Sequence, residues 1–222
     1  MSDHAPEVEP APSEPELGRF ISASRKARVR EALEHRLGSV VTVVEAVHRR
    51  HNTSAILRSC EAFGVHEVHM VTGPFRPAKG AARGAERWLE LQLQDSVEAS
   101  LDALRSRGFR IVVADLQDRA YTPDSVPVDG PLAVVFGNEL EGVSDAARSR
   151  ADGAITVPMM GLTESLNVSV AAACILQRVT TRRRQHLGVA GDLSAERKAS
   201  FDRMWQERED AIRLARRHRT RA

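Results

Sequence analysis

Short apolar runs recur along the middle of the chain and are separated by segments with the periodicity of helices. Runs of about four to eight apolar residues are typical of strands that are buried on both faces. Leucine alternates with glutamate and glutamine over residues 89–94, which is the period of a half-buried strand. Strands that alternate with helices predict an α/β fold, in which a mostly parallel sheet has helices on both faces. The buried strands are predicted at residues 39–47, 66–72, 109–115, 132–136 and 154–157.

Capping residues mark the ends of the helices between these strands. Asn52 is expected to cap the first helix, and Gly64 follows it, where a left-handed residue commonly ends a helix. Asp95 and Glu98 form a capping-box pattern, which opens a helix that ends at Gly108. Two longer helices are predicted over residues 165–185 and 195–219. The second has a narrow apolar stripe that is typical of packing: Phe201, Met204, Trp205 and Ile212.

Charge divides the chain into four parts. Residues 1–18 contain five acidic and no basic residues and are rich in proline, so we expect an acidic, disordered tail. Residues 19–38 contain six basic and two acidic residues and are expected to form a basic helix. Residues 178–222 contain 13 basic and six acidic residues, whereas residues 39–177 contain 13 and 17. We therefore predict a folded domain over 39–187, with a basic helical extension over 188–222.

Basic residues gathered in two segments around an acidic middle are typical of a protein that binds a polyanion such as RNA. The alternative is that these residues only solvate the outer faces of helices. The sequence has neither a signal peptide nor an apolar stretch near the roughly 20 residues of a membrane span, so we expect a cytoplasmic protein. Cys60 and Cys174 stand in apolar, helical contexts and are predicted to be reduced core residues, without a disulfide or a metal.

The first segment that could carry chemistry is residues 51–65. Its apolar residues cluster on one side of a helical wheel, and Arg58 points away from them between the small residues Ala55 and Ala62. The guanidinium of Arg58 is therefore free to meet a ligand, although an ordinary solvated arginine would give the same pattern.

The second segment is residues 134–144, in which an apolar strand runs directly into Gly137 and Glu139. Ligands of open α/β sheets bind just beyond the carboxyl ends of strands. Gly137 allows close approach of the backbone, and Glu139 can accept hydrogen bonds. The alternative is a plain strand and turn, followed by a helix that Ser144 caps.

The third segment is residues 155–176, in which a strand ends at Pro158 and a glycine-containing loop follows. Ser165, Asn167 and Ser169 surround a predicted helix start, whose free N–H groups and dipole suit an anion. The alternative is a well-capped core helix, since residues 171–173 are all alanine and suit close packing.

The three segments together closely resemble the SpoU/TrmH branch of the SPOUT RNA 2′-O-methyltransferases, over about residues 40–185. The first family motif stands as Asn52, Ala55, Arg58 and Gly64. The second stands as Phe136, Gly137, Glu139, Gly142 and Val143. The third stands as Pro158, Met159, Gly161, Ser165, Leu166, Asn167, Val168, Ser169 and Ala171.

The resemblance implies a fold whose C-terminal part is tied into a deep trefoil knot, which no periodicity could predict. It also implies S-adenosylmethionine as cofactor, and a homodimer whose active sites use residues of both subunits. The helix over 165–185 is expected in the interface, where Ala172 would allow close approach of two helices. The cofactor-binding residues implied by position are Ala114, Asp115, Leu116, Gly137, Glu139, Val157, Met159, Gly161, Ser165 and Leu166.

The family's catalytic arginine corresponds to Arg58. Since a guanidinium keeps its proton in almost every protein setting, we expect Arg58 to position the nucleotide and stabilise the developing oxyanion. The resemblance implies that Asn52 holds the loop or the ribose, and that Ser165 and Asn167 seat a phosphate or the methionine moiety. Glu139 completes the expected catalytic set, and methyl transfer of this kind needs no metal.

Short basic extensions on both sides of the domain resemble the tRNA guanosine-18 branch of the family. The alternatives are a ribosomal RNA 2′-O-methyltransferase, including the antibiotic-resistance type, and a non-catalytic RNA-binding module. The residues expected to contact RNA are Arg25, Lys26, Arg28, Arg30, His51, Arg182, Arg183 and Arg184.

Overall fold

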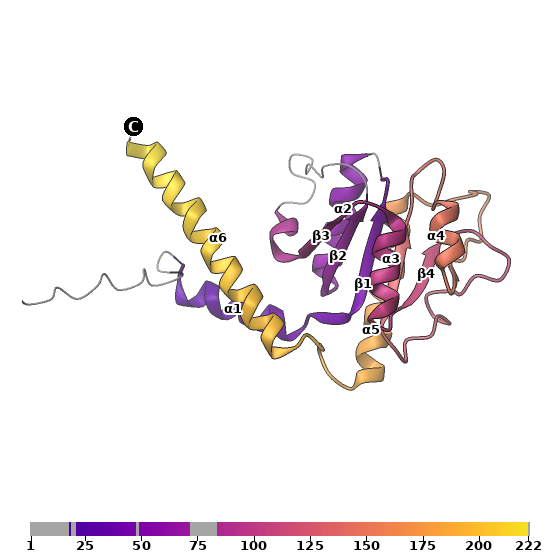
Figure 1. Ribbon diagram of the computed structural model, residues 1–222, viewed down its shortest axis with the longest axis horizontal. Helices are drawn as coiled ribbons and strands as arrows, with labels where there is room; N and C mark the ends of the chain where they lie inside the picture. The colour runs from indigo at the N-terminus through magenta and orange to yellow at the C-terminus, as the bar shows by residue number, and fades with distance from the viewer. Residues whose placement is uncertain (1–17, 19–20, 48, 72–83, 222) are drawn as a thin grey trace, which may run out of the picture. The chain divides into compact units, whose positions relative to one another are not determined.

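The computed structural model describes residue 18 and residues 21–47, 49–71 and 84–221, with side chains up to residue 214 (Figure 1). The predicted acidic tail lies outside the described residues, apart from Gly18. The chain divides into two compact units. Residues 31–195 form one unit, and residues 1–30 together with 196–222 form the other.

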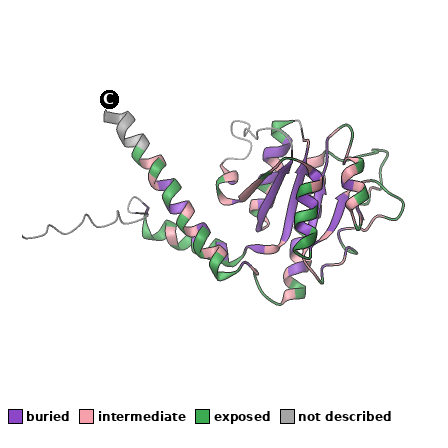
Figure 2. Cartoon of the chain, viewed as in Figure 1, coloured by how far each residue is buried: buried purple, intermediate pink, exposed green. Residues whose placement is uncertain are grey.

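The larger unit is built on a six-stranded sheet in the order β3-β2-β1-β5-β4-β6, with every pair of neighbouring strands parallel. The predicted α/β fold with a parallel sheet is therefore confirmed. Val, Ile and Leu fill the central strands because helices cover both of their faces, and Figure 2 shows these strands as buried. The strands are β1 Leu37–Glu45, β2 Val65–Val71, β3 Glu90–Gln94, β4 Arg110–Ala114, β5 Leu132–Phe136 and β6 Gly153–Ile155.

Helices cover the two faces of this sheet in pairs. α2 (Arg50–Ala62) and α5 (Val168–Leu187) share one apolar core with the sheet, and α3 (Val97–Ser106) and α4 (Asp145–Arg150) share the other (Figure 1). A short 3₁₀ helix, η1 (Ala85–Trp88), precedes β3. The crossovers bring the carboxyl ends of all six strands to one edge, where α/β proteins bind ligands.

Three predicted helix starts were wrong, and each error has a local cause. α2 begins before Asn52, with Arg49 at the N-cap position and no side-chain cap. The Asn52 side chain is instead buried in the candidate site. Ser96 caps α3 in place of Asp95, because its hydroxyl accepts the Ala99 N–H at 3.1 Å. α5 begins at Val168, where Asn167 caps it through the Ser169 N–H at 2.9 Å, so Ser165 lies in the preceding loop.

The two cysteines are both free, but only Cys60 is a core residue. Cys174 is exposed on α5, which contradicts its assignment to the core. Ala172, two residues earlier, is completely buried in its own subunit and cannot lie in an interface. An apolar run in sequence does not reveal which of its faces the sheet covers, and α5 turns Ala172 inward and Cys174 outward.

The smaller unit contains the start of α1 (Ala23–Glu34) and α6 (Ala195–Arg221). Two ion pairs join them, Arg25–Glu209 at 3.4 Å and Arg30–Asp202 at 3.1 Å. Phe201 and Trp205 of the predicted stripe are buried. Residues 23–30 and 196–221, which are far apart in sequence, thus belong to a single unit, whereas Arg36 and Arg182, Arg183 and Arg184 belong to the larger one.

No helix of the described residues is long and apolar enough to cross a membrane. Within the same part of the chain, no group of His, Cys, Asp and Glu side chains is arranged to hold a metal ion.

Candidate active site

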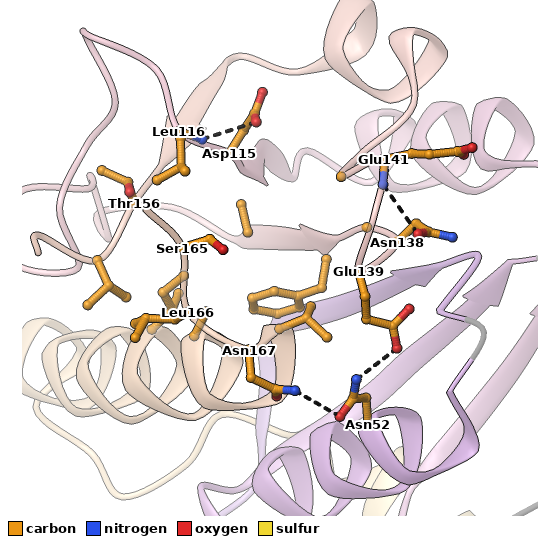
Figure 3. Close-up of a pocket in the computed structure, with 18 of the residues that line it drawn as sticks. Asn52, Asp115, Leu116, Asn138, Glu139, Glu141, Thr156, Ser165, Leu166 and Asn167 are labelled. Carbon is orange, nitrogen blue, oxygen red and sulfur yellow. Dashed lines mark hydrogen bonds between the residues drawn. The ribbon is translucent and has the colours of Figure 1, made fainter. Parts of the chain in front are cut away.

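A pocket of about 500 Å³ opens at the carboxyl ends of β4, β5 and β6 (Figure 3). Its walls come from Ala114–Leu116 after β4, Phe136–Gly142 after β5 and Ile155–Val157 after β6. The loop before α5 and the first turn of α2 close the remaining side. The volume lies within the range of about 300–1,000 Å³ that is usual for small-ligand sites.

Three side chains from distant segments form a hydrogen-bonded chain along one wall. Asn167 Nδ2 donates to Asn52 Oδ1 at 3.2 Å, and Asn52 Nδ2 donates to Glu139 Oε1 at 2.8 Å (Figure 3). The backbone N–H of Arg49 also donates to Glu139 Oε1, at 3.3 Å. Asn52 is only 4% exposed, so both ends of its amide are fixed by these partners. The chain orients the Glu139 carboxylate at the edge of the pocket.

The turn after β5 is held in shape by its own backbone and by Asn138. A Cβ atom at Gly137 would lie 2.2 Å from the carbonyl oxygen of Gly142, so only glycine fits there. Asn138 Oδ1 accepts the N–H of Leu140 at 2.7 Å, and Asn138 Nδ2 donates to the Ala46 carbonyl at 3.1 Å. This rigid turn places Glu139 against α2.

Asp115 and Arg148 form an ion pair at the opposite end of the pocket. Arg148 Nε donates to Asp115 Oδ2 at 2.9 Å, and Gln117 Nε2 donates to the same oxygen at 2.9 Å. Burial tends to raise the pKa of the Asp115 carboxyl. The hydrogen bonds from Arg148 and Gln117 and the charge of Arg148 outweigh it, so this pKa lies below its ordinary value. Asp115 is therefore ionised at neutral pH.

Most of the predicted site residues meet in this pocket. Arg58 does not line it: this side chain is exposed on α2 and has no hydrogen bond or ion pair with any other described residue. Gly161 also lies outside the lining. The predicted residues that line the pocket are Asn52, Ala114, Asp115, Leu116, Gly137, Glu139, Val157, Met159, Ser165, Leu166 and Asn167.

Arg183 does not fit the predicted contact with RNA, and the half-buried Arg182 and Arg184 have hydrogen-bond partners within the chain. Arg183 is only 6% exposed, and its guanidinium donates to the Val128 carbonyl at 2.8 Å and to Ser39 Oγ at 2.9 Å. Arg182 donates to the carbonyls of Pro123 and Val126, and Arg184 to those of His35, Phe63 and Ala190. All three guanidinium groups serve to fix neighbouring loops on α5.

The other predicted RNA contacts lie on accessible parts of the chain. Arg25, Arg28 and Arg30 are exposed on α1, and Lys26 is half-buried there. His51 is exposed in the first turn of α2, beside Asn52.

Sequence reasoning missed several pocket residues. Asn138 lies inside the second motif, and its short amide after a strand was a usable signal for a turn. Arg49 and Arg148 gave no such signal, because an arginine next to a helix is most often solvated. The pairing of Arg148 with Asp115 depends on a contact across 33 positions in sequence.

Comparison with known proteins shows the family to which the chain belongs. Residues 39–177 match the SpoU rRNA Methylase family, and the chain belongs to this family. It is 41% identical over 155 residues to the tRNA (guanosine(18)-2′-O)-methyltransferase of Thermus thermophilus, covering 69% of this chain and 80% of that protein. It is 34% identical over 171 residues to the Escherichia coli protein of the same name, covering 76% and 74%.

A crystal structure with the same architecture is that of the A. aeolicus TrmH/SpoU tRNA modifying enzyme. It superposes with a TM-score of 0.77 at 32% sequence identity and covers 84% of this chain and 96% of that one.

Proposed function

We propose that this protein transfers a methyl group from S-adenosylmethionine to the ribose 2′-hydroxyl of guanosine 18 in tRNA, in the cytoplasm. The observation that carries the proposal is the Asn167–Asn52–Glu139 chain, which joins all three sequence motifs at one pocket. The relatives named for this reaction support the choice of tRNA and of the nucleotide, because the chain aligns with about three quarters or more of their length.

The pocket suits S-adenosylmethionine in size and in chemistry. Val157, Met159 and Leu166 offer apolar surface for an adenine ring, and Gly137 keeps the backbone accessible. Asp115, Leu116, Ala114 and Ser165 complete the proposed binding residues. When bound, this cofactor supplies an electrophilic methyl group on a sulfonium, so that transfer to an oxygen needs no metal.

The residues around the pocket have separate proposed roles in the transfer. Asn52 and Asn167 hold Glu139 in one orientation, and Glu139 accepts a hydrogen bond from the nucleotide. Arg58 stabilises the negative charge that develops on the ribose oxygen, since a guanidinium presents several N–H donors to one oxygen. Because Arg58 does not line the pocket of its own chain, we assign this role to Arg58 of the partner subunit in a homodimer.

The proposal includes the trefoil knot. Tyr121 pairs with Ile155, and the Thr156 N–H donates to the Tyr121 carbonyl at 2.8 Å, while β4 lies on the other side of β6. The segment over residues 115–131 therefore passes around the outer side of β6 before it returns to β5. Arg182 ties the same segment to α5. These contacts favour a chain that threads this loop on its way from β6 to α5.

We assign tRNA binding to the smaller unit. Two arginines, one exposed and one buried, test this assignment. Replacing the exposed Arg28 with alanine should weaken tRNA binding and reduce the slope of log affinity against log salt by about one, with the stability unchanged. Replacing the buried Arg183 with alanine should cost about 1.5–3 kcal/mol of stability, because it leaves two acceptors unpaired, and should not change that slope. Filter binding at several salt concentrations and urea unfolding measure the two effects. An unchanged slope for Arg28→Ala would show that Arg28 does not contact a phosphate of the tRNA.

Methyl transfer to defined RNAs tests the function itself. The full-length protein is incubated with labelled S-adenosylmethionine and either a tRNA transcript, the same tRNA with 2′-deoxyguanosine at position 18, or ribosomal RNA. We expect label only in the first, because the second lacks the accepting hydroxyl. Label only in ribosomal RNA would favour the ribosomal alternative, and tight binding of tRNA without transfer would favour a non-catalytic module.

A further inference from the structure

We infer that Asp115 accepts hydrogen bonds from the ribose hydroxyls of the methyl donor, and that Arg148 is the positioning residue that holds Asp115 in place. This inference rests on the proposed function, since it deepens the recognition of the cofactor in the same pocket. Arg148 belongs to none of the three motifs, and the residues after β4 have no motif to anchor them. Only the folded chain brings the two together.

The contacts of Asp115 fix the direction of its carboxylate and leave part of its hydrogen-bond acceptor capacity unused. Oδ2 accepts from Arg148 Nε and from Gln117 Nε2, each at 2.9 Å, and Oδ1 accepts the Leu116 N–H at 3.0 Å. A carboxylate offers about four acceptor positions, so these three bonds leave capacity for a ligand hydroxyl. The Asp115 side chain is 18% exposed, and Asp115 and Arg148 both line the pocket.

Arg148 is itself tied to the framework of the site. Its Nη1 donates to Asp145 Oδ1 at 3.0 Å, one turn back on α4, and its Nη2 lies over Gly142 in the turn after β5. One guanidinium thus links α4 and the turn that carries Glu139 to the loop after β4. Such a link fixes the direction of the Asp115 carboxylate relative to the rest of the pocket.

The position of Asp115 in the pocket suits a contact with the ribose of the cofactor. The Asn167–Asn52–Glu139 chain marks the end where transfer takes place, and Asp115 and Leu116 lie together at the opposite end (Figure 3). The nucleoside therefore belongs at the Asp115 end, with the apolar side chains of Leu116 and Leu166 against the base. A diol is the hydrogen-bond donor that an ionised carboxylate beside an adenine recognises.

Binding of S-adenosylhomocysteine and its deoxyribose analogues tests the role of Asp115. With the wild-type protein, removing the 2′- or the 3′-hydroxyl should weaken binding about ten- to a hundredfold, the effect of one hydrogen bond to a charged group. Asp115→Asn should bind the parent compound more weakly by a similar factor and should lose most of this sensitivity. Full sensitivity to the analogues in Asp115→Asn would overturn the inference and leave the proposed function intact. If the wild-type protein bound none of these compounds, the proposed function itself would fail.

The pH dependence of binding tests Arg148. The groups that face Asp115 are Arg148, the neutral Gln117 and, through Arg148, Asp145, while Glu139 and Glu141 line the same pocket. Without the guanidinium the pKa of the Asp115 carboxyl should be higher than in the wild type, because burial still raises it and Arg148 no longer lowers it. As the pH is lowered from 8, the affinity for S-adenosylhomocysteine should therefore begin to fall at a higher pH in Arg148→Met than in the wild type.

Two further variants separate positioning from general damage to the fold. Arg148→Lys should restore part of the affinity at pH 8 and most of the wild-type pH profile, because it keeps a positive charge near Asp115. Arg150→Ala removes an arginine of the same helix that pairs with Asp102 outside the pocket, and it should behave as the wild type. The same pH profile in Arg148→Met as in the wild type, with the protein folded by circular dichroism, would show that Arg148 does not act through Asp115.

Discussion

Replacing Arg58 with alanine should lower the rate of methyl transfer about 10²–10³-fold while the affinity for S-adenosylmethionine stays near that of the wild type. The expected loss is that of one donor which stabilises charge only in the transition state. The cofactor affinity should hold because Arg58 does not line the pocket of its own chain. The fold should hold as well, since this side chain is exposed and pairs with no other described residue.

Single-turnover rates with tRNA and calorimetric binding of S-adenosylhomocysteine measure the two quantities separately. Arg58→Lys should recover little of the rate, because an ammonium group does not reproduce the planar fork of donors. Arg110→Ala, which removes a half-buried arginine that pairs with Asp129 at the amino end of β4, away from the pocket, serves as the control. Near-normal turnover by Arg58→Ala would sink the catalytic assignment.

The strands and the location of the site could be predicted because both depend on local patterns. Apolar runs of strand length that alternate with helical segments favour a parallel sheet buried on both faces, and the carboxyl ends of parallel strands lie at one edge of the sheet. The second strand is predicted over 66–72 and found at Val65–Val71, and the strand over 132–136 coincides with β5. The resemblance to the family then pointed to the side chains at that edge.

What could not be predicted depends on contacts between distant residues. The sequence is compatible with two roles for Asn52, a helix cap and the centre of a buried hydrogen-bonded chain. The contacts with Glu139 and Asn167 show that it has the second role. Arg182, Arg183 and Arg184 resemble a phosphate-binding site in the sequence, because their charge can be read from it. The backbone carbonyl groups that accept their hydrogen bonds cannot be read from the sequence. The same holds for Arg148, whose partner lies on another loop.

The exposed side of α5 gives the second large effect that we expect. Val170 is 48% exposed and Leu166 in the preceding loop 38% exposed, and Cys174 lies one turn beyond Val170 on the same face. Met160, in the loop that lines the pocket, is 94% exposed. Apolar side chains gathered beside a pocket mark an interaction surface. A second copy of the chain is the partner that would also bring an Arg58 to this pocket.

Val170→Arg should therefore convert a dimer into monomers and lower methyl transfer about as far as Arg58→Ala does. In an isologous interface each subunit would bury one unpaired arginine, so the substitution destabilises the dimer twice. The folded subunit should survive, because Val170 faces away from its own core, unlike the fully buried Ala172. Sedimentation velocity at micromolar concentration measures the mass. Gln185→Arg, near the other end of the same helix, is the matched control and should remain dimeric and active.

Mixing two inactive variants tests whether the dimer shares its active sites. Arg58→Ala and Asn52→Ala each lack one component, and in a hybrid dimer one of the two sites receives an intact Asn52 from one subunit and an intact Arg58 from the other. Subunit exchange between equal amounts of the two variants should make about half of the dimers hybrid and restore about a quarter of the wild-type activity. If each site were built within one chain, every site in the mixture would keep a defect and no activity would return. A fully active Val170→Arg monomer would also contradict a shared site. Arg58 would then have to act on the pocket of its own subunit.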